Sequence, residues 1–140
     1  MLIRDATLTD RDAIVAIDHL AHERIDFIER ALRSRSCLVA ERDGQVVAYG
    51  VLEYTFFEHG FVSMLYVAQA ERRHGIGRAL MEALASRCRT RKLFTSTNES
   101  NRPMHQLLKT MGYIPSGIIE NLAPGDPEVV YFHDLGERAV

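Results

Sequence analysis

The sequence predicts a mixed α/β fold, in which a mostly antiparallel central sheet of about seven strands is flanked by about four helices. Short apolar runs typical of strands outnumber the segments with helical periodicity. An Asp43-Gly44 pair separates two of these runs, which is a strong signal for a β-hairpin. Another run leads through Gly75 and Gly77 into an amphipathic helix. The strands therefore do not alternate regularly with helices.

The first half of the chain is predicted to hold one strand, two helices and a hairpin. Thr9 is expected to cap the first helix, because acidic residues and the apolar positions Ala13, Ile14 and Ile17 follow it. The expected elements are, in order, a strand at 2–6, the helix after Thr9, a helix at 24–33, strands at 37–42 and 45–54, and a turn at 56–60.

The second half is predicted to alternate between strands and helices before it ends in two strands. Gly112 is expected to end the last helix, since glycine is favoured just after a helix. The expected elements are a strand at 61–67, a helix from the glycines to about residue 90, a strand at 93–97, a helix at 101–111, and strands at 113–120 and 129–134.

Composition indicates one soluble, cytoplasmic domain over residues 1–140. The chain is 46% hydrophobic and has a net charge of −2, so no basic field favours nucleic acid. It has no apolar run of about 18 residues, as a membrane-spanning helix needs. Cys37 and Cys88 form no metal-ligand spacing and are expected to be reduced, and no metal is expected.

A glycine-containing run at residues 72–78 predicts a site for phosphate. Two glycines between a strand and a helix leave backbone N–H groups uncovered, and the helix dipole favours an anion there. A Walker A loop is excluded, because no Gly-Lys-Ser/Thr ending is present. A Rossmann fingerprint is disfavoured, because Leu80 stands where its third glycine belongs.

The pattern Arg72-x-x-Gly75-x-Gly77 resembles the acetyl-coenzyme A signature of the GCN5-related N-acetyltransferases (GNAT family), Gln/Arg-x-x-Gly-x-Gly/Ala. The segment from Asn101 to Tyr113 is similar to a later motif of the family, in which an Asn precedes a helix ending in Gly-Phe/Tyr. The predicted order of elements also resembles the family's fold. The resemblance implies the GNAT fold, with its fourth and fifth strands splayed apart.

The resemblance implies that acetyl-CoA is the donor and that a primary amine of a small molecule, peptide or protein is the acceptor. The amides of residues 73–78 would hold the pyrophosphate, a strand segment the pantetheine arm, and one or two asparagines the amides of the coenzyme. Helix capping is the alternative role for Asn98 and Ser100. The implied coenzyme-binding residues are Leu65, Tyr66, Val67, Arg72, Arg73, His74, Gly75, Ile76, Gly77, Arg78, Asn98 and Asn101.

The proton path is less defined. Glu53, Glu58 and His59 are candidates for the base, since they lie on or before the strand expected beside the thioester. Many family members have a tyrosine as general acid four residues before the motif's glycine, where this chain has Leu108. The alternative donors are Tyr131, Tyr113, water or His105, or the thiolate leaves unaided.

Two further alternatives follow. The acidic residues Glu120, Asp126 and Glu128 would attract a cationic amine if their loop borders the acceptor, or they form only a solvated loop. Leu108 favours the competing hypothesis of a non-catalytic acyl-CoA-binding or sensor domain. Family members are often dimers, so a homodimer is a further expectation.

Overall fold

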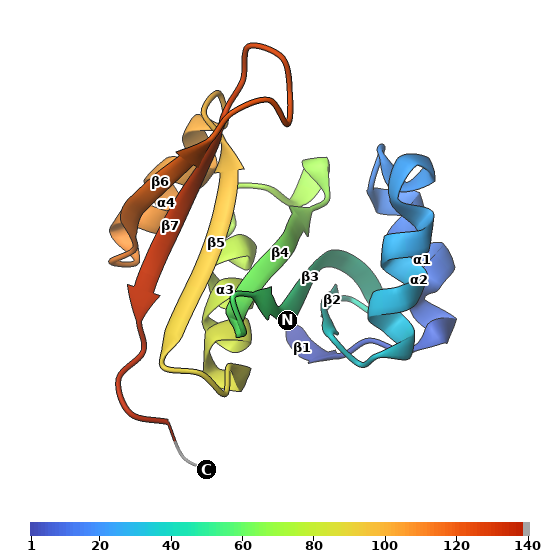
Figure 1. Ribbon diagram of the computed structural model, residues 1–140. Helices are drawn as coiled ribbons and strands as arrows, with labels where there is room; N and C mark the ends of the chain where they lie inside the picture. Colours follow the sequence, from blue (N-terminus) through green and yellow to red (C-terminus); the bar gives the residue numbers. More distant parts are fainter. Residues whose placement is uncertain (139–140) are drawn as a thin grey trace. The chain divides into compact units, whose positions relative to one another are not determined.

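The computed structural model describes residues 1–138 (Figure 1). Its strands are β1 (Leu2–Asp5), β2 (Cys37–Arg42), β3 (Gln45–Phe56), β4 (His59–Val67), β5 (Lys92–Asn98), β6 (Ile114–Ile119) and β7 (Glu128–Asp134). Its α-helices are α1 (Arg11–Ile17), α2 (Ile25–Arg33), α3 (Ile76–Arg87) and α4 (Arg102–Thr110). Hydrogen bonding orders the strands β1-β2-β3-β4-β5-β7-β6, which confirms the predicted mixed sheet. The chain divides into two compact units, residues 1–52 with 64–87, and residues 53–63 with those from 88 on.

Two local predictions are wrong. Thr9 does not cap α1, because a short 3-10 turn at Leu8–Asp10 comes first and the Asp10 carboxylate accepts a hydrogen bond from the Thr7 amide at 2.8 Å. The turn expected at 56–60 contains only Phe57 and Glu58, with φ angles of 52° and 67°. Positive φ at both central residues is what a two-residue hairpin turn requires, here without glycine or asparagine.

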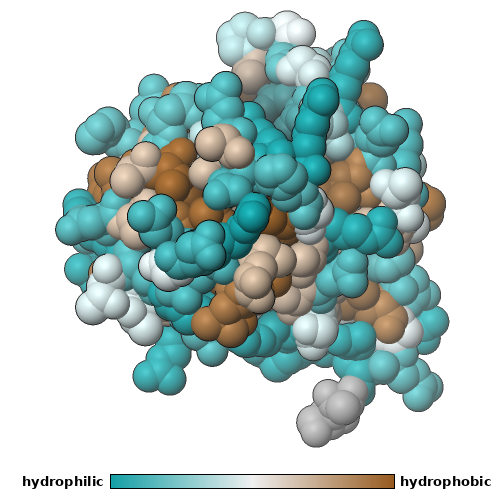
Figure 2. All heavy atoms as spheres, turned by 180° about the vertical axis from the view of Figure 1, so that it is seen from behind, coloured by the Kyte–Doolittle hydropathy of each residue, from teal (hydrophilic) through white to brown (hydrophobic). Residues whose placement is uncertain are grey.

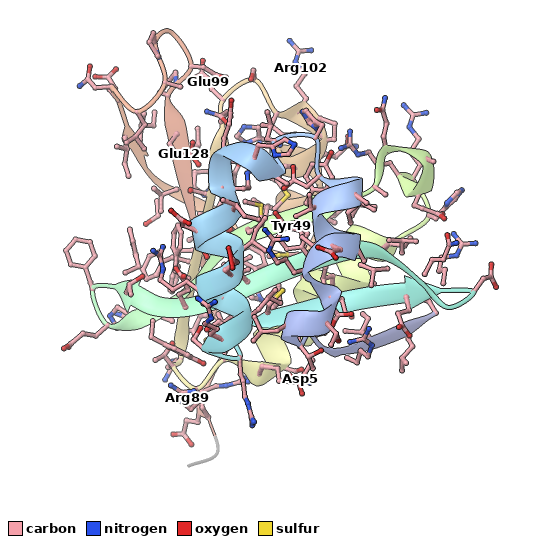
Figure 3. The ribbon with its side chains drawn as sticks, turned by 90° about the vertical axis from the view of Figure 1, so that its right-hand side faces the viewer. Asp5, Tyr49, Arg89, Glu99, Arg102 and Glu128 are labelled. Atoms are coloured by element: carbon pink, nitrogen blue, oxygen red, sulfur yellow. The ribbon has the colours of Figure 1, made fainter. Side chains whose placement is uncertain are left out.

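In the first unit, helices lie on both faces of the strands. Alternate residues of β2 and β3, among them Val39, Tyr49 and Val51, join Ile14 of α1 and Ile28 of α2 in one buried cluster. Tyr49 lies near the centre of the view in Figure 3. The opposite face of β3 packs against α3. A Cβ atom at Gly50 would lie 2.7 Å from a methyl carbon of Leu84, so the absence of a side chain at Gly50 lets α3 approach β3 closely.

In the second unit, β5 is bonded on both sides. The start of β4 pairs with it in parallel, Gly60–Val62 against Leu93–Thr95, and β7 pairs with it along seven residues in antiparallel. The Thr95 hydroxyl also donates to the Val62 carbonyl at 2.9 Å, at the end of the parallel pairing. His105 of α4 contacts Tyr131 of β7, so the helix lies on the face that carries Tyr131.

The opposite face of this unit carries a row of apolar residues that are direct cross-strand partners. Phe61, Phe94, Phe132 and Ile114 succeed one another across β4, β5, β7 and β6. Phe56 stacks on Phe61, with ring centroids 4.9 Å apart. The row therefore continues into the β3–β4 hairpin.

Strand β6 is an edge strand of the sheet, and all six of its residues are exposed. Its pairing with β7 shifts register between Pro115 and Gly117. Ile114, Ile118 and Ile119 nevertheless stay 40–61% exposed.

The molecular face in Figure 2 is mostly hydrophilic, with separate apolar patches. No helix within residues 1–138 combines the length and hydropathy needed to cross a membrane.

Candidate functional site

Residues 72–78, here called the phosphate loop, join β4 to α3 through a short 3-10 turn at Gln69–Glu71. Arg73 and Gly75 both have left-handed backbone, with φ angles of 69° and 77°. A Cβ atom at Gly75 would meet nothing within 4 Å, so the loop is open at this point. Ile76 is 2% exposed and fixes the start of α3 in the core of its unit.

The backbone amides of this loop are free to bind a ligand. Within residues 1–138, the N–H groups of residues 73–78 have no hydrogen-bond acceptor, and the first helical bond runs from the Ala79 amide to the Gly75 carbonyl at 3.1 Å. Backbone in which left-handed residues alternate with others can direct successive N–H groups toward one anion, and the dipole of the twelve-residue α3 adds positive potential. The arrangement fits the oxygens of a diphosphate.

The three arginines of the loop differ in their surroundings. Arg72 donates to the Val67 carbonyl at 3.0 Å and lies over the Tyr66 ring, and Arg78 pairs with Glu82 at 3.1 Å. Arg73 is exposed and has no hydrogen-bond or ion-pair partner among the residues described. Of the three arginines, Arg78 is paired with a carboxylate, Arg72 is held by a neutral carbonyl and an aromatic ring, and Arg73 has no such contact among the residues described.

The segment between α1 and α2 is tied to β3 and β4 within the same unit. Asp18 is buried and accepts a hydrogen bond from the Tyr49 hydroxyl at 2.5 Å, with Arg24 3.4 Å away. Burial and this hydrogen bond raise the pKa of Tyr49 well above its usual range. His19 Nδ1 lies 2.8 Å from the Tyr66 hydroxyl. The sequence predicts a role for Tyr66 but not for Asp18, His19 or Tyr49, because the partners in these contacts lie 31 to 47 positions apart.

The second junction between a strand and a helix, from β5 to α4, is closed by side chains. The Asn101 side chain accepts from the Met104 amide at 3.3 Å and caps α4, so the capping expected of Asn98 or Ser100 belongs to Asn101. The amide and hydroxyl of Ser100 donate to the two carboxylate oxygens of Asp126, at 3.0 and 2.6 Å. The Asn98 side chain donates to the Asp126 carbonyl at 3.3 Å. Asp126 therefore holds a loop, with both its oxygens occupied.

Tyr131 of β7 and His105 of α4 form a close pair. Tyr131 is 1% exposed, and its hydroxyl lies 2.6 Å from His105 Nδ1. Burial raises the pKa of Tyr131, so its phenol stays protonated at neutral pH. Leu108 is fully buried in the helix above and has no proton to donate. Tyr113 is buried against the His133 ring, its hydroxyl has no partner within residues 1–138, and burial raises its pKa to about 12.

The other candidate groups lie at the β3–β4 hairpin and at the start of β7. Glu53 and His59 are half-buried, whereas Glu58 lies on the exposed turn. In the described part of the chain, neither glutamate has a hydrogen-bond or ion-pair partner. Glu128 accepts from the Ser96 hydroxyl at 2.8 Å, and Glu120 is exposed. These acidic groups do not converge on one another in any contact that the structure shows.

Comparison with known proteins gives consistent matches. Residues 6–113 match the family model described as "Acetyltransferase (GNAT) family". An N-alpha-acetyltransferase of Sulfurisphaera tokodaii is 31% identical over 131 residues, which span 79% of this chain and 78% of that protein. A GNAT-family acetyltransferase of Bacillus cereus superposes with a TM-score of 0.88 at 31% identity, covering 95% and 96% of the two chains. The ribosomal-protein-alanine N-acetyltransferase of Brucella melitensis gives 0.81 at 25% identity, covering 96% and 100%.

Proposed function

Because the chain belongs to the acetyltransferase (GNAT) family and transfers an acetyl group from acetyl-CoA to a primary amine, we propose that its acceptor is the N-terminal α-amine of a polypeptide. The observation that carries this proposal is the 31% identity to an N-alpha-acetyltransferase over 79% of the chain. The non-catalytic sensor domain is not favoured, because the family model and this relative both describe transferases.

The phosphate loop fits the donor. We assign the pyrophosphate of acetyl-CoA to the free amides of residues 73–78, with Arg73 as the exposed arginine that no other described residue holds. We assign the pantetheine arm to the backbone of Leu65, Tyr66 and Val67, which leads into that loop. The Asn101 side chain still has its NH2 group to offer, because only its oxygen caps α4. The bound coenzyme supplies an acetyl group activated as a thioester.

The chain itself must handle two protons. An ammonium has no lone pair, so a base must first take a proton from the acceptor. Glu53, Glu58 and His59 are the proposed bases, and the two glutamates have no competing cation in the described part of the chain. Tyr131 is the proposed donor to the departing sulfur, because the position usual for that tyrosine holds the buried Leu108.

The acceptor is tested by a comparison of matched amines. One substrate is a peptide with a free N-terminal alanine and one internal lysine, and the second is the same peptide with its N-terminus formylated. The third is a short diamine, and thiol release from acetyl-CoA is followed for each. We expect the free peptide to have a kcat/KM at least tenfold above the other two. Equal turnover of the formylated peptide, or faster turnover of the diamine, would reject the N-terminal amine as the acceptor.

A further inference from the structure

His105 bridges two strands of its unit through both ring nitrogens. Nε2 lies 3.0 Å from the Asn98 carbonyl of β5, and Nδ1 lies 2.6 Å from the Tyr131 hydroxyl of β7. A carbonyl oxygen only accepts, so Nε2 must carry a hydrogen. In the neutral ring Nδ1 is then an acceptor, and the Tyr131 hydroxyl donates its hydrogen to it. The neutral pair therefore points the phenolic proton at His105.

Protonation of the ring reverses the second hydrogen bond. The imidazolium has a hydrogen on both nitrogens, so Nδ1 donates to the Tyr131 oxygen while Nε2 keeps its bond to Asn98. The Tyr131 hydrogen is then free to point elsewhere. The pair thus has two states that differ by one proton, and only the charged state leaves Tyr131 able to donate to a third group.

His105 also connects this buried phenol to solvent. Its side chain lines a hollow of about 600 Å³ on α4, together with Arg102, Gln106, Lys109 and Thr110. Arg102 points outward from the start of the helix (Figure 3). The groups that face the ring are thus the Tyr131 hydroxyl of β7, the Asn98 carbonyl of β5 and the two cations of α4 that share the hollow. Protons can reach His105 from water, whereas Tyr131 is 1% exposed.

We propose that His105 is a positioning residue that returns a proton to Tyr131, the proton donor for the departing thiolate. This inference rests on the acetyl transfer and on the role proposed above for Tyr131. When the C–S bond breaks, Tyr131 gives its proton to the sulfur and takes the Nδ1 proton of the imidazolium, which leaves His105 neutral. His105 then takes a proton from water through the hollow. The acceptor ammonium loses two protons in all. One is equivalent to the proton gained by the product thiol, and the other is released to solution.

Two variants test the relay. Tyr131→Phe removes the donor and keeps the ring, whereas His105→Gln keeps a donor for Asn98 and an acceptor for Tyr131 but carries no exchangeable charge. We expect Tyr131→Phe to lower kcat about 100-fold and His105→Gln at least tenfold, with the KM for acetyl-CoA changed less than twofold. The double variant should match Tyr131→Phe alone, because the two residues act as one unit. Gln106→Ala, in the same hollow, is the control and should retain its kcat.

A readout independent of turnover is the nitrogen NMR spectrum of His105 in the coenzyme-free protein. We expect the neutral wild-type ring to carry its hydrogen on Nε2, and Tyr131→Phe to shift the Nδ1 resonance without unfolding the protein. A neutral ring with its hydrogen on Nδ1, or full kcat in His105→Gln, would overturn the relay. So would losses that multiply in the double variant. The kinetic measurements use the amine that the wild type acetylates fastest. A wrong proposal for the acceptor therefore does not affect the test of the relay, and the two failures can be told apart.

Discussion

The chain contains two junctions of the same kind, a strand followed by a loop and a helix, and they treat the start of the helix in opposite ways. Between β4 and α3, the amides of residues 73–78 have no acceptor in the described part of the chain. Between β5 and α4, Asn101 caps the helix and Asp126 binds the amide and hydroxyl of Ser100. The amides of the first junction are left without acceptors, whereas those at the second junction are bound by side chains of the protein.

The difference lies in which side chains the loops carry. The phosphate loop has glycine at residue 75, just before α3, so no side-chain oxygen competes for the helical amides. At the other junction the Asn101 side-chain oxygen accepts from a helical amide, and the Asp126 carboxylate accepts from the amide and hydroxyl of Ser100 just before the helix. The start of a helix can bind an anion only where no side chain of the protein caps its amides.

The largest expected effect on the open junction comes from Gly75→Ala. Its φ of 77° costs alanine about 1–2 kcal/mol, which should disturb the arrangement of the loop amides and weaken coenzyme A binding about tenfold. Gly44→Ala is a matched control, because Gly44 has the same φ and an equally open environment in the β2–β3 hairpin. Calorimetric titration with coenzyme A and thermal unfolding separate the effects. Equal losses of affinity in both variants would contradict the role of this loop.

The closed junction is tested by Asn101→Ala, which should lower the free energy of unfolding by about 1 kcal/mol through loss of the cap. Asn101→Ser keeps a capping oxygen but lacks the NH2 group. We expect serine to restore stability in thermal unfolding while the KM for acetyl-CoA stays raised about threefold. If serine restores KM as well, Asn101 is a cap alone.

The smallest effect is expected from the arginines of the open junction. Arg73→Ala should weaken coenzyme A binding about threefold in 50 mM salt and less in 300 mM salt, because an exposed charge is screened. Arg78→Ala should change affinity less, since Glu82 already compensates that charge. Titrations at the two salt concentrations provide the measurement. A larger loss for Arg78→Ala would reverse this assignment.

The same contrast explains which features the sequence could reveal. The junction between β4 and α3 is predictable because its signal is local, consisting of two glycines and a helical period within a dozen residues. The cap of α1 was misplaced, because the Thr7 amide bonds to Asp10 and two threonines offer similar signals. The turn predicted at 56–60 is longer than the observed one, because Phe57 and Glu58 are unusual residues for the positive φ angles of a two-residue turn.

Local sequence patterns do not predict contacts between residues that are distant in the sequence. His105 and Tyr131 are 26 residues apart, and Asp18 and Tyr49 are 31 apart, so no spacing marks either pair. Each depends on which strand becomes the neighbour of which helix. Asp126 shows the same limit, since its sequence suggests a free carboxylate in an acidic loop and the structure places both oxygens on Ser100.

The edge strand β6 has a consequence for colloidal behaviour. An exposed edge with three outward isoleucines would ordinarily act as a template onto which other chains add strands. Pro115 has no N–H group to donate to a neighbouring strand, and the register shift between Pro115 and Gly117 interrupts the regular ladder of this edge. We therefore expect the irregular pairing of β6 to hinder the addition of strands from other chains at this apolar edge.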